Sequence, residues 1–420
     1  MKILLSAYSC LPTDGSEPAI GWNWAHCIAA KGHDVVVITR AVNRQRIEAH
    51  RQGSSTDAVQ FVYYDLPRAF EALYSLPLGN YAYYTLWQYS AAKLACSLHR
   101  SERFDCVQHI TWGTLRGPSW MGRLGIPFIF GPVGGGEDTP RKLRRGLGWR
   151  GRLWDALRRA PRKPIALWME STYESATEIV TTTQETLAAI PAKHRQKAWS
   201  RQAVGIDAQF TRPGGNSPSA RQESSRLELL FVGRLLPWKG LHLVFKALAR
   251  LDANRSSIHF TVIGTGSDLA RLRRLSRRLK LEDMVSWRGW MERNALLDVY
   301  REFDLFMLPS LHDSGGMAVL EAMRFGLPVV CLDLGGPATA VNNQCGRVIA
   351  TGDRDEEEIV RDIAEFLAGL LANRSSLSKL SDAARDRAAT LTFQANVDAV
   401  YQHPPVSQAR AFEGVICAED

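Results

Sequence analysis

Residues 309–333 constrain the fold more than any other part of this sequence, because they combine a glycine loop, a short helix and a strand. Apolar runs of strand length occupy 304–308 and 329–332, on either side of the predicted helix. Gly326 and Pro328 stand where the end of a helix is normally closed. The stretch therefore predicts at least one βαβ unit.

The predicted start of this helix has the features of an anion-binding site. Two glycines there let a ligand approach the backbone, and the free amides of a helix start attract negative charge. Asp313 precedes the glycines, and Glu321 follows Asp313 by eight positions. Phosphate at the amides and hydroxyl groups at the carboxylates would together describe a sugar nucleotide. The predicted contacts on the helix are Gly315, Gly316, Met317, Ala318 and Glu321.

This stretch resembles the signature of glycosyltransferase family 4, in which an acid is followed by seven residues, Glu-Ala-Met and a Gly-x-Pro-Val-Val tail. The family usually has Glu at the first acid, whereas this chain has Asp313, which is one methylene shorter. The resemblance implies that Asp313 is catalytic and holds sugar hydroxyls, and that Glu321 holds the ribose hydroxyls. The alternative is a plain βαβ unit with a glycine turn. Further family motifs in the family's order disfavour that alternative.

A second motif of the family follows the predicted strand 227–232. Residues 233–240 have the form of the family's Gly-Arg-x(n)-Lys-Gly loop. The resemblance implies that Arg234 and Lys239 are catalytic and hold the donor diphosphate. Departure of a nucleoside diphosphate builds negative charge, which a guanidinium and an ammonium group can stabilise.

Two turns of the second half are weaker candidates. The strand 259–263 ends in Gly-Thr-Gly, which stops short of a full G-x-G-x-x-G because the sixth place is Leu269. Gly266 is predicted to contact the donor, with a tight βα turn as the alternative. The family's nucleobase lies against the turn that matches 288–291, so the resemblance implies that Met291 contacts the base.

The first half begins with a βαβ pattern: a strand at 3–7, a helix at 20–30 and a strand at 35–39. The family places a glycine loop after its first strand, facing the donor diphosphate. Gly15 matches that place, so the resemblance implies donor contact, with a plain surface loop as the alternative.

His109 is the remaining catalytic candidate. It stands near the end of the predicted strand 106–110, and ligands of α/β sheets bind at the carboxyl ends of strands. Many family members carry a histidine at the end of the strand that matches 126–130, where this chain has Gly131. A catalytic role for His109 and a structural one both stay open.

The resemblance covers most of the chain and implies an α/β fold of the GT-B type, two facing Rossmann-like domains with a cleft between them. The predicted division is an acceptor-binding domain at 1–200, a linker at 201–226, a nucleotide-sugar domain at 227–375 and a returning helix with a tail at 376–420. The linker contains a segment similar to the family's interdomain turn, in which Gly205, Asp207 and Phe210 match.

The resemblance further implies a retaining glycosyltransferase of hexosyltransferase type. It would move a sugar from a nucleoside-diphosphate sugar to a glycan or lipid-linked acceptor, in cell-surface polysaccharide or glycolipid synthesis. Two other classes stay open. One is a sugar-nucleotide epimerase on the same fold, and the other is an inactive sugar-nucleotide-binding subunit.

The only Asp-x-Asp of the chain, Asp353 to Asp355, could hold a divalent cation on a diphosphate. The alternative is an acidic first turn of a helix, where carboxylates suit the helix dipole. Because Arg234 and Lys239 are present, we expect no metal and no other cofactor.

Positive charge is concentrated in residues 141–163. The chain carries a net charge of +9, and this segment alone holds ten basic residues and one acid. Leu153, Trp154 and Leu157 suit a short amphipathic helix from about Arg152, and such basic helices lie on anionic membranes. A basic surface that binds a soluble polyanion, or nothing, is the alternative. Nucleic acid is disfavoured, because no recognition motif accompanies the charge.

The sequence predicts a cytoplasmic protein, peripheral on the inner face of the cytoplasmic membrane. The seven cysteines form no C-x-x-C pair, which favours reduced thiols. The apolar part of residues 1–10 is shorter than the core of a signal peptide, and we expect it to be a buried strand.

Overall fold

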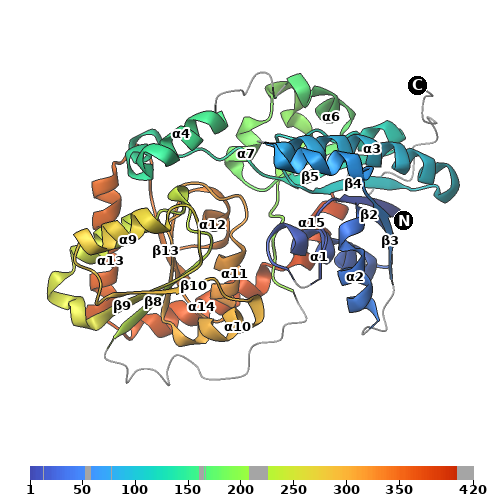
Figure 1. Ribbon diagram of the computed structural model, residues 1–420. Coiled ribbons are helices and arrows are strands. Elements are labelled where there is room, and N and C mark those ends of the chain that lie inside the picture. Colours follow the sequence, from blue (N-terminus) through green and yellow to red (C-terminus); the bar gives the residue numbers. More distant parts are fainter. Residues whose placement is uncertain are drawn as a thin grey trace. The chain divides into compact units, whose positions relative to one another are not determined.

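The computed structural model describes residues 1–12, 14–52, 58–76, 78–159, 165, 167–207 and 226–403. The chain divides into two compact units (Figure 1). The first unit consists of Met1–Gly136, Pro161–Asp207 and Phe393–Asp420, and the second of Glu137–Ala160 and Ala208–Thr392.

Seven parallel strands form the sheet of the first unit, in the order β3-β2-β1-β4-β5-β6-β7. Most are unbroken apolar runs, because a parallel sheet is buried on both faces. Helix α3 (Gly79–Glu102) covers one face, where its Trp87 and Tyr84 share a core with Leu4 and Phe130 (Figure 1). The strands are β1 (Lys2–Ala7), β2 (Asp34–Arg40), β3 (Val59–Tyr64), β4 (Cys106–Thr111), β5 (Phe128–Val133), β6 (Glu178–Thr181) and β7 (Ala198–Ser200). The other helices are α1 (Glu17–Ala30), α2 (Arg44–Arg51), α6 (Glu170–Ser175), α7 (Gln184–Ala189) and α15 (Phe393–Tyr401).

Six parallel strands form the sheet of the second unit, in the order β10-β9-β8-β11-β12-β13. They are β8 (Leu227–Val232), β9 (Ile258–Ile263), β10 (Val285–Gly289), β11 (Leu305–Leu308), β12 (Val329–Leu332) and β13 (Gly346–Ile349). The helices are α8 (Leu241–Ala249), α9 (Leu269–Arg278), α10 (Arg293–Val299), α11 (Met317–Arg324), α12 (Gly335–Ala340), α13 (Glu356–Ala372) and α14 (Ser376–Thr390). This unit also contains a 3-10 helix, η4 (Arg141–Leu147), and α4 (Gly148–Arg159).

Strand β5 differs most from the sequence prediction. It starts at Phe128 and continues through Gly131 to Val133, so Gly131 lies inside the strand and not at its end. The register with β6 shifts between Phe130 and Val133, and a Cβ at Gly131 would stand 2.1 Å from the carbonyl oxygen of Val180. Glycine is therefore needed for this close pairing. The edge strands β7 and β13 were not predicted.

Residues 137–160 were expected in the N-terminal domain, but the structure groups them with the second unit. Leu143 and Leu147 are buried, and Arg271 of α9 donates from Nη1 to the carbonyl oxygen of Gly146 at 2.8 Å. Helix α4 also starts at Gly148, four residues before the expected Arg152. Residues 160–163 of this basic segment lie outside the described residues.

The predicted returning helix is in fact two helices. Helix α14 belongs to the second unit, and α15 joins the first, where it packs against α1. Tyr401 of α15 donates its hydroxyl to Oε1 of Gln108 at 2.7 Å. Residues 208–225 of the predicted linker, which include Phe210, lie outside the described residues, and so does the tail after His403. Within the described ranges, every helix is too short or too polar to span a bilayer.

Candidate functional site

The order of the strands defines where a ligand should bind in each unit. In the second sheet the chain runs from β8 to β9 and β10 on one side and then crosses to β11 on the other side of β8, so the strand order reverses at β8. In the first sheet β2 and β4 flank β1 in the same way. Open α/β sheets bind ligands at such switch points, beyond the carboxyl ends of the strands. The residues predicted from the sequence to be functional lie on or near these edges.

The loops after β8 and β11, residues 233–240 and 309–316, are bound to each other. The amide of Leu311 donates to the carbonyl oxygen of Trp238 at 2.7 Å, and the hydroxyl of Ser310 donates to the same oxygen at 3.2 Å. The rings of Trp238 and His312 stack with centroids 5.0 Å apart. These contacts fix the neighbours of Lys239 and Asp313.

Lys239 and Asp313 form an ion pair at this switch point. Lys239 Nζ contacts Asp313 Oδ2, and each side chain is 18% exposed. Gly240 has a φ of +74°, and a Cβ there would lie 1.9 Å from the carbonyl oxygen of Pro309. Glycine therefore lets the two loops approach, which brings the ammonium group to the carboxylate.

Arg234 is the second cation of the same loop. Its side chain is exposed and has neither a hydrogen-bond nor an ion-pair partner among the residues that the structure describes. Arg234 can therefore bind an incoming anion without first breaking an ion pair, whereas Lys239 is already held by Asp313.

The start of α11 follows Asp313 closely. Gly316 caps the helix in a left-handed conformation, with φ +83° and ψ 39°. A Cβ on Gly336 would lie 2.5 Å from the carbonyl oxygen of Gly315, and the Gly336 amide donates to the Asp313 carbonyl at 2.7 Å. This packing positions Gly315, Gly316, Met317 and Ala318, whose helix-start amides lack acceptors within α11 and can hold an anion.

Glu321 lies one turn further along α11, between two partners that the sequence did not suggest. Arg293 donates from Nη2 to Oε1 at 3.1 Å, and Tyr300 donates its hydroxyl to Oε2 at 3.2 Å. Burial raises the pKa of Glu321, although Arg293 and Tyr300 both lower it. Arg293 and Tyr300 precede Glu321 by 28 and 21 positions, so no local pattern indicated them.

Gly266 and Met291 lie on the loops after β9 and β10. A Cβ on Gly266 would stand 2.3 Å from the carbonyl oxygen of Leu235, and Asp268 N donates to that oxygen at 2.9 Å. The tight turn thus accounts for Gly266 without a ligand. Met291 is half-buried and follows the exposed Trp290.

The first unit places Gly15 beside a carboxylate that the sequence analysis did not select. Gly15 is open, with no atom within 4 Å of a Cβ built on it. Glu17, at the start of α1, is half-buried and accepts a backbone hydrogen bond from Gly113. Burial raises the pKa of Glu17 to about 7. A carboxyl group that titrates near neutral pH at a switch point is a candidate site residue.

His109 does not reach the surface. It is fully buried, its Nε2 lies 3.3 Å from the hydroxyl of Tyr84 and 3.1 Å from the carbonyl oxygen of Trp112, and its ring packs on Phe130. Burial lowers its pKa to about 4, so the ring is neutral at pH 7. In this structure His109 cannot touch a substrate, and the structural alternative explains it.

The buried His109 should make stability depend on pH. Its pKa is about 4 in the native structure against an ordinary 6.5, so between about pH 6.5 and pH 4 the unfolded chain protonates this ring and the native structure does not. Stability is then lost by up to about 1.4 kcal/mol per pH unit as the pH falls. Between neutral and mildly acidic pH, His109→Gln should lose less stability in urea unfolding than the parent. His50→Gln, which changes an exposed histidine of α2, should follow the parent; equal losses in both variants would contradict the assignment.

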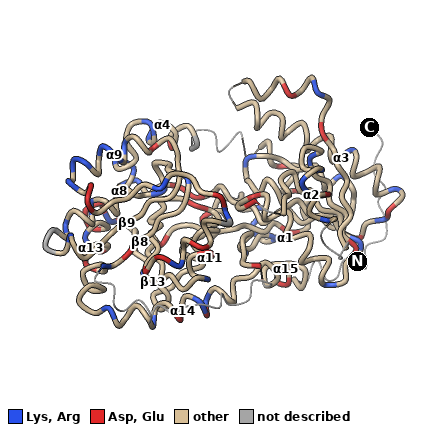
Figure 2. Tube along the Cα trace, turned by 60° about the horizontal axis from the view of Figure 1, so that its bottom comes forward, with Lys and Arg blue, Asp and Glu red and all other residues tan. Residues whose placement is uncertain are grey.

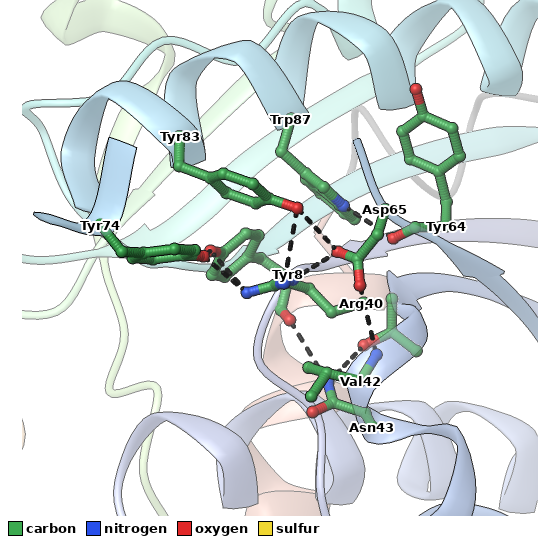
Figure 3. Close-up of polar contacts among 10 residues, drawn as sticks. Tyr8, Arg40, Val42, Asn43, Tyr64, Asp65, Tyr74, Tyr83 and Trp87 are labelled. Atoms are coloured by element: carbon green, nitrogen blue, oxygen red, sulfur yellow. Dashed lines mark hydrogen bonds and ion pairs between the residues drawn. The ribbon is translucent and has the colours of Figure 1, made fainter. Parts of the chain in front are cut away.

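An aromatic cluster surrounds Arg40 beyond the carboxyl ends of β1 and β2 (Figure 3). The guanidinium lies 4.7 Å from the Tyr83 ring centroid and 5.4 Å from that of Tyr8, and Nη1 donates to the Tyr74 hydroxyl at 2.7 Å. Asp65 pairs with Arg40. Exposed apolar and aromatic side chains border this cluster: Phe70, Tyr74, Leu76, Leu78 and Tyr81. Such a surface can hold a sugar ring or an apolar group.

The Asp-x-Asp pair has a local structural role. The Asp355 carboxylate accepts from the Glu358 amide at 3.0 Å, and Glu358 Oε2 accepts from the Asp355 amide at 3.0 Å, which makes a capping box on α13. The Asp353 side chain is exposed and pairs with Lys142. The acidic helix turn thus accounts for both aspartates.

Both halves of the chain match known glycosyltransferase families. Residues 216–387 match the family described as glycosyl transferases group 1, and residues 15–204 match the glycosyl transferase 4-like domain. Together these matches span most of the chain. The protein therefore belongs to the group 1 glycosyltransferases, with a 4-like N-terminal half, as the sequence motifs predicted.

Curated relatives match over part of their length. D-inositol 3-phosphate glycosyltransferase 2 of Catenulispora acidiphila is 34% identical over 210 residues, which are 46% of this chain and 47% of that protein. The putative colanic acid biosynthesis glycosyltransferase WcaL of Salmonella typhimurium is 28% identical over 171 residues, 39% of this chain and 40% of that protein. The chain spans about half the length of the curated relatives it matches.

Solved structures match almost the whole chain. WaaG, a glycosyltransferase involved in lipopolysaccharide biosynthesis, has 19% identity and a TM-score of 0.60, covering 95% of this chain and 98% of its own. Anabaena HepE in complex with UDP-glucose has 16% identity and a TM-score of 0.61, covering 97% of this chain and 100% of its own. At these identities the likeness shows the fold alone, and it confirms the two-domain α/β fold of the GT-B type.

Proposed function

We propose that this protein is a retaining glycosyltransferase that takes its sugar from a nucleoside-diphosphate sugar. The observation that carries the proposal is the placement of Lys239, Asp313 and Arg234 at one switch point, beside the open amides of α11. The amides and the two cations suit a diphosphate, and Asp313 and Glu321 suit hydroxyl groups. The HepE complex with UDP-glucose, on the same fold, supports a sugar nucleotide as donor.

In the proposed reaction, the bond between the anomeric carbon and the β-phosphate oxygen breaks, and the acceptor oxygen bonds to that carbon on the same face. The acceptor proton passes to the departing phosphate oxygen. Arg234 and Lys239 stabilise the charge that develops on the diphosphate. Asp313 is held by Lys239, so we assign it to the sugar hydroxyls and not to nucleophilic attack. We expect the reaction to proceed without a metal.

The acceptor is proposed to be a glycan or a lipid-linked sugar bound by the first unit. The aromatic cluster around Arg40 offers a suitable surface there. The names of WaaG and WcaL, which refer to lipopolysaccharide and colanic acid biosynthesis, support a role in cell-surface glycan synthesis.

The purified protein tests the function directly. A panel of nucleoside-diphosphate sugars is incubated with and without a bacterial lipid extract, and release of the nucleoside diphosphate is followed. Release that requires the extract, persists in EDTA and yields a product with the donor's anomeric configuration by NMR is expected. Conversion of a sugar nucleotide into its epimer without any release would point to the epimerase instead. No turnover with any donor would point to a binding subunit.

We also propose that α4 attaches the protein to an anionic membrane surface. Trp149 is 67% exposed, Trp154 and Leu153 are each 55% exposed, and Leu157 is also exposed. Arg150 lies over the Trp149 ring at 5.1 Å, so a cation accompanies the apolar surface. Tryptophan and leucine beside basic residues suit the interface between headgroups and acyl chains.

Replacing Trp149 and Trp154 together by serine should strongly reduce sedimentation with anionic liposomes. The two indoles would supply most of the apolar surface that enters the bilayer. Both rings are exposed, so the melting temperature should stay near that of the parent. Arg144 must be left in place, because its Nε lies 3.5 Å from the buried carboxylate of Asp155. Trp290→Ser removes an equally exposed ring elsewhere in the unit and should bind liposomes like the parent. Equal sedimentation of all three proteins would exclude α4 as the attachment site.

A further inference from the structure

A pocket of the second unit, with a volume of about 530 Å³, lies between α8 and α9. Its lining includes five cationic side chains: Arg145, Lys246, Arg271, Arg274 and Arg278. Figure 2 shows Lys and Arg gathered along α9. The start of α4 lies beside α9, because a Cβ on Gly148 would stand 3.3 Å from Cδ of Arg271. None of the residues assigned to the donor lines this pocket, although α8 begins two residues after Lys239.

Two acidic residues compensate only part of this charge. Asp268 accepts two hydrogen bonds from Arg271, at 2.6 and 2.7 Å, and Glu356 pairs with Lys246. The other three cations, which are Arg145, Arg274 and Arg278, have no acidic partner in the part of the chain that the structure describes. The pocket thus keeps three positive charges close together, which an anion would neutralise.

His242 adds an unpartnered polar group to the wall. It is 2% exposed, and neither ring nitrogen has a hydrogen-bond partner among the described residues. Buried polar groups are normally paired, so each exception calls for an explanation. Burial, with smaller effects of Arg271 and Lys246, lowers the pKa of His242 to about 3, so the ring is neutral and has one N–H to donate.

Gly146 lines the pocket next to the His242 ring and has no side chain to cover it. A Cβ on Gly146 would stand 2.3 Å from Nε2 of His242 and 2.5 Å from Oε2 of Glu356. The Gly146 carbonyl oxygen accepts a hydrogen bond from Arg271, so the backbone at Gly146 is fixed to α9. The imidazole is therefore kept free of side-chain cover by the local sequence.

We propose that this pocket binds a phosphate group carried by an anionic membrane lipid. Arginine forks match the oxygens of a phosphate, and His242 would donate to one of them. The source follows from the neighbouring helix: Gly148 both lines the pocket and begins α4, whose Trp149 and Trp154 are exposed. A headgroup in the pocket would place its acyl chains beside these indoles. The inference extends the proposed membrane contact of α4 and does not depend on sugar transfer.

The test compares two double variants of one helix. Arg274→Ser with Arg278→Ser removes two unpaired cations from the pocket, and Arg273→Ser with Arg277→Ser removes the same charge from α9 outside it. All four side chains are exposed, so both variants should fold. Binding is measured to phosphatidylcholine vesicles that contain either phosphatidylglycerol or oleate at equal surface charge. A second measurement follows the melting temperature with inorganic phosphate against chloride at equal ionic strength.

The parent and the control variant should bind phosphatidylglycerol vesicles severalfold more tightly than oleate vesicles, and the pocket variant should lose this preference. Phosphate should raise the melting temperature of the parent and the control variant only. If phosphate raises the melting temperature of the parent and the control variant only, while no protein prefers phosphatidylglycerol vesicles to oleate vesicles, the lipid is overturned as the source of the phosphate. Equal behaviour of the two variants in both measurements would overturn the pocket itself. Neither readout uses a nucleotide sugar, so failure here leaves the proposed transferase activity untouched, and loss of transfer leaves this site untouched.

Discussion

Lys239→Ala should lower kcat about a hundredfold or more, because removing one preorganised group that stabilises developing charge has effects of that order in other enzymes. Lys239 is held against Asp313 at the switch point, with only 18% of its side chain exposed. Its ammonium group is therefore in place before the diphosphate begins to leave. The KM for the donor should change less than kcat, because the charge is largest in the transition state.

The control for this prediction is another lysine that pairs with a carboxylate. Lys193 Nζ lies 2.6 Å from Glu170 in the first unit, and its side chain is 63% exposed. Lys193→Ala should retain the parent's kcat. Removing Lys239 also leaves Asp313 without its ion-pair partner, so Lys239→Ala is combined with Asp313→Asn. If the double variant regains the parent's kcat, the loss came from the uncompensated aspartate and Lys239 does not act on the diphosphate.

Glu321→Ala should weaken donor binding about 5- to 150-fold, which corresponds to the 1–3 kcal/mol lost when a buried polar group goes unpaired. The carboxylate is 14% exposed and fixed by Arg293 and Tyr300, so its orientation toward a ribose is set before the donor arrives. Titration with the donor, by calorimetry or by inhibition with the free nucleoside diphosphate, measures the change in Kd.

Two further substitutions separate binding from stability. Glu321→Gln keeps one acceptor oxygen for Arg293 and places an NH2 group beside the Tyr300 hydroxyl, which can accept from it. This variant should lose less affinity than Glu321→Ala. The melting temperature of both variants is measured beside Kd, so that a loss of stability is not mistaken for a loss of a donor contact. Glu302→Ala removes an exposed carboxylate that pairs with Arg288 at 2.9 Å, and it should bind donor like the parent. Parental affinity in Glu321→Ala would remove Glu321 from the site.

Most strands could be predicted from the sequence, because the strands of a parallel sheet are buried on both faces and are therefore unbroken apolar runs. The prediction for 329–332 coincides with β12, and those for β1 and β4 end within a residue or two of the observed strands. The edge strands β7 and β13 were not predicted, because they have only three and four residues and each includes a polar or charged side chain. Strand β5 was misplaced, because a glycine within a strand looks like its end.

The site was predictable where motifs are local and not where partners come from distant elements. The spacing of Asp313 and Glu321 identified both carboxylates, but it contained no information on Arg293 or Tyr300. His109 was selected for its place at a strand end. Its complete enclosure depends on Tyr84 of α3 and Phe130 of β5, which only the tertiary structure brings together.

The polypeptide passes from one unit to the other four times, after Gly136, Ala160, Asp207 and Thr392. During synthesis on the ribosome, the first unit therefore lacks its final helix, α15, until almost the whole chain has been made. Until then the surface of α1 that α15 covers, and the partner of Gln108, remain open to solvent or to chaperones. A chimera that exchanged one unit for that of a relative would likewise need four junctions. Recombination at a single crossover between the two halves of the sequence would leave each unit with one helical segment from the other parent, 137–160 in the second unit and α15 in the first.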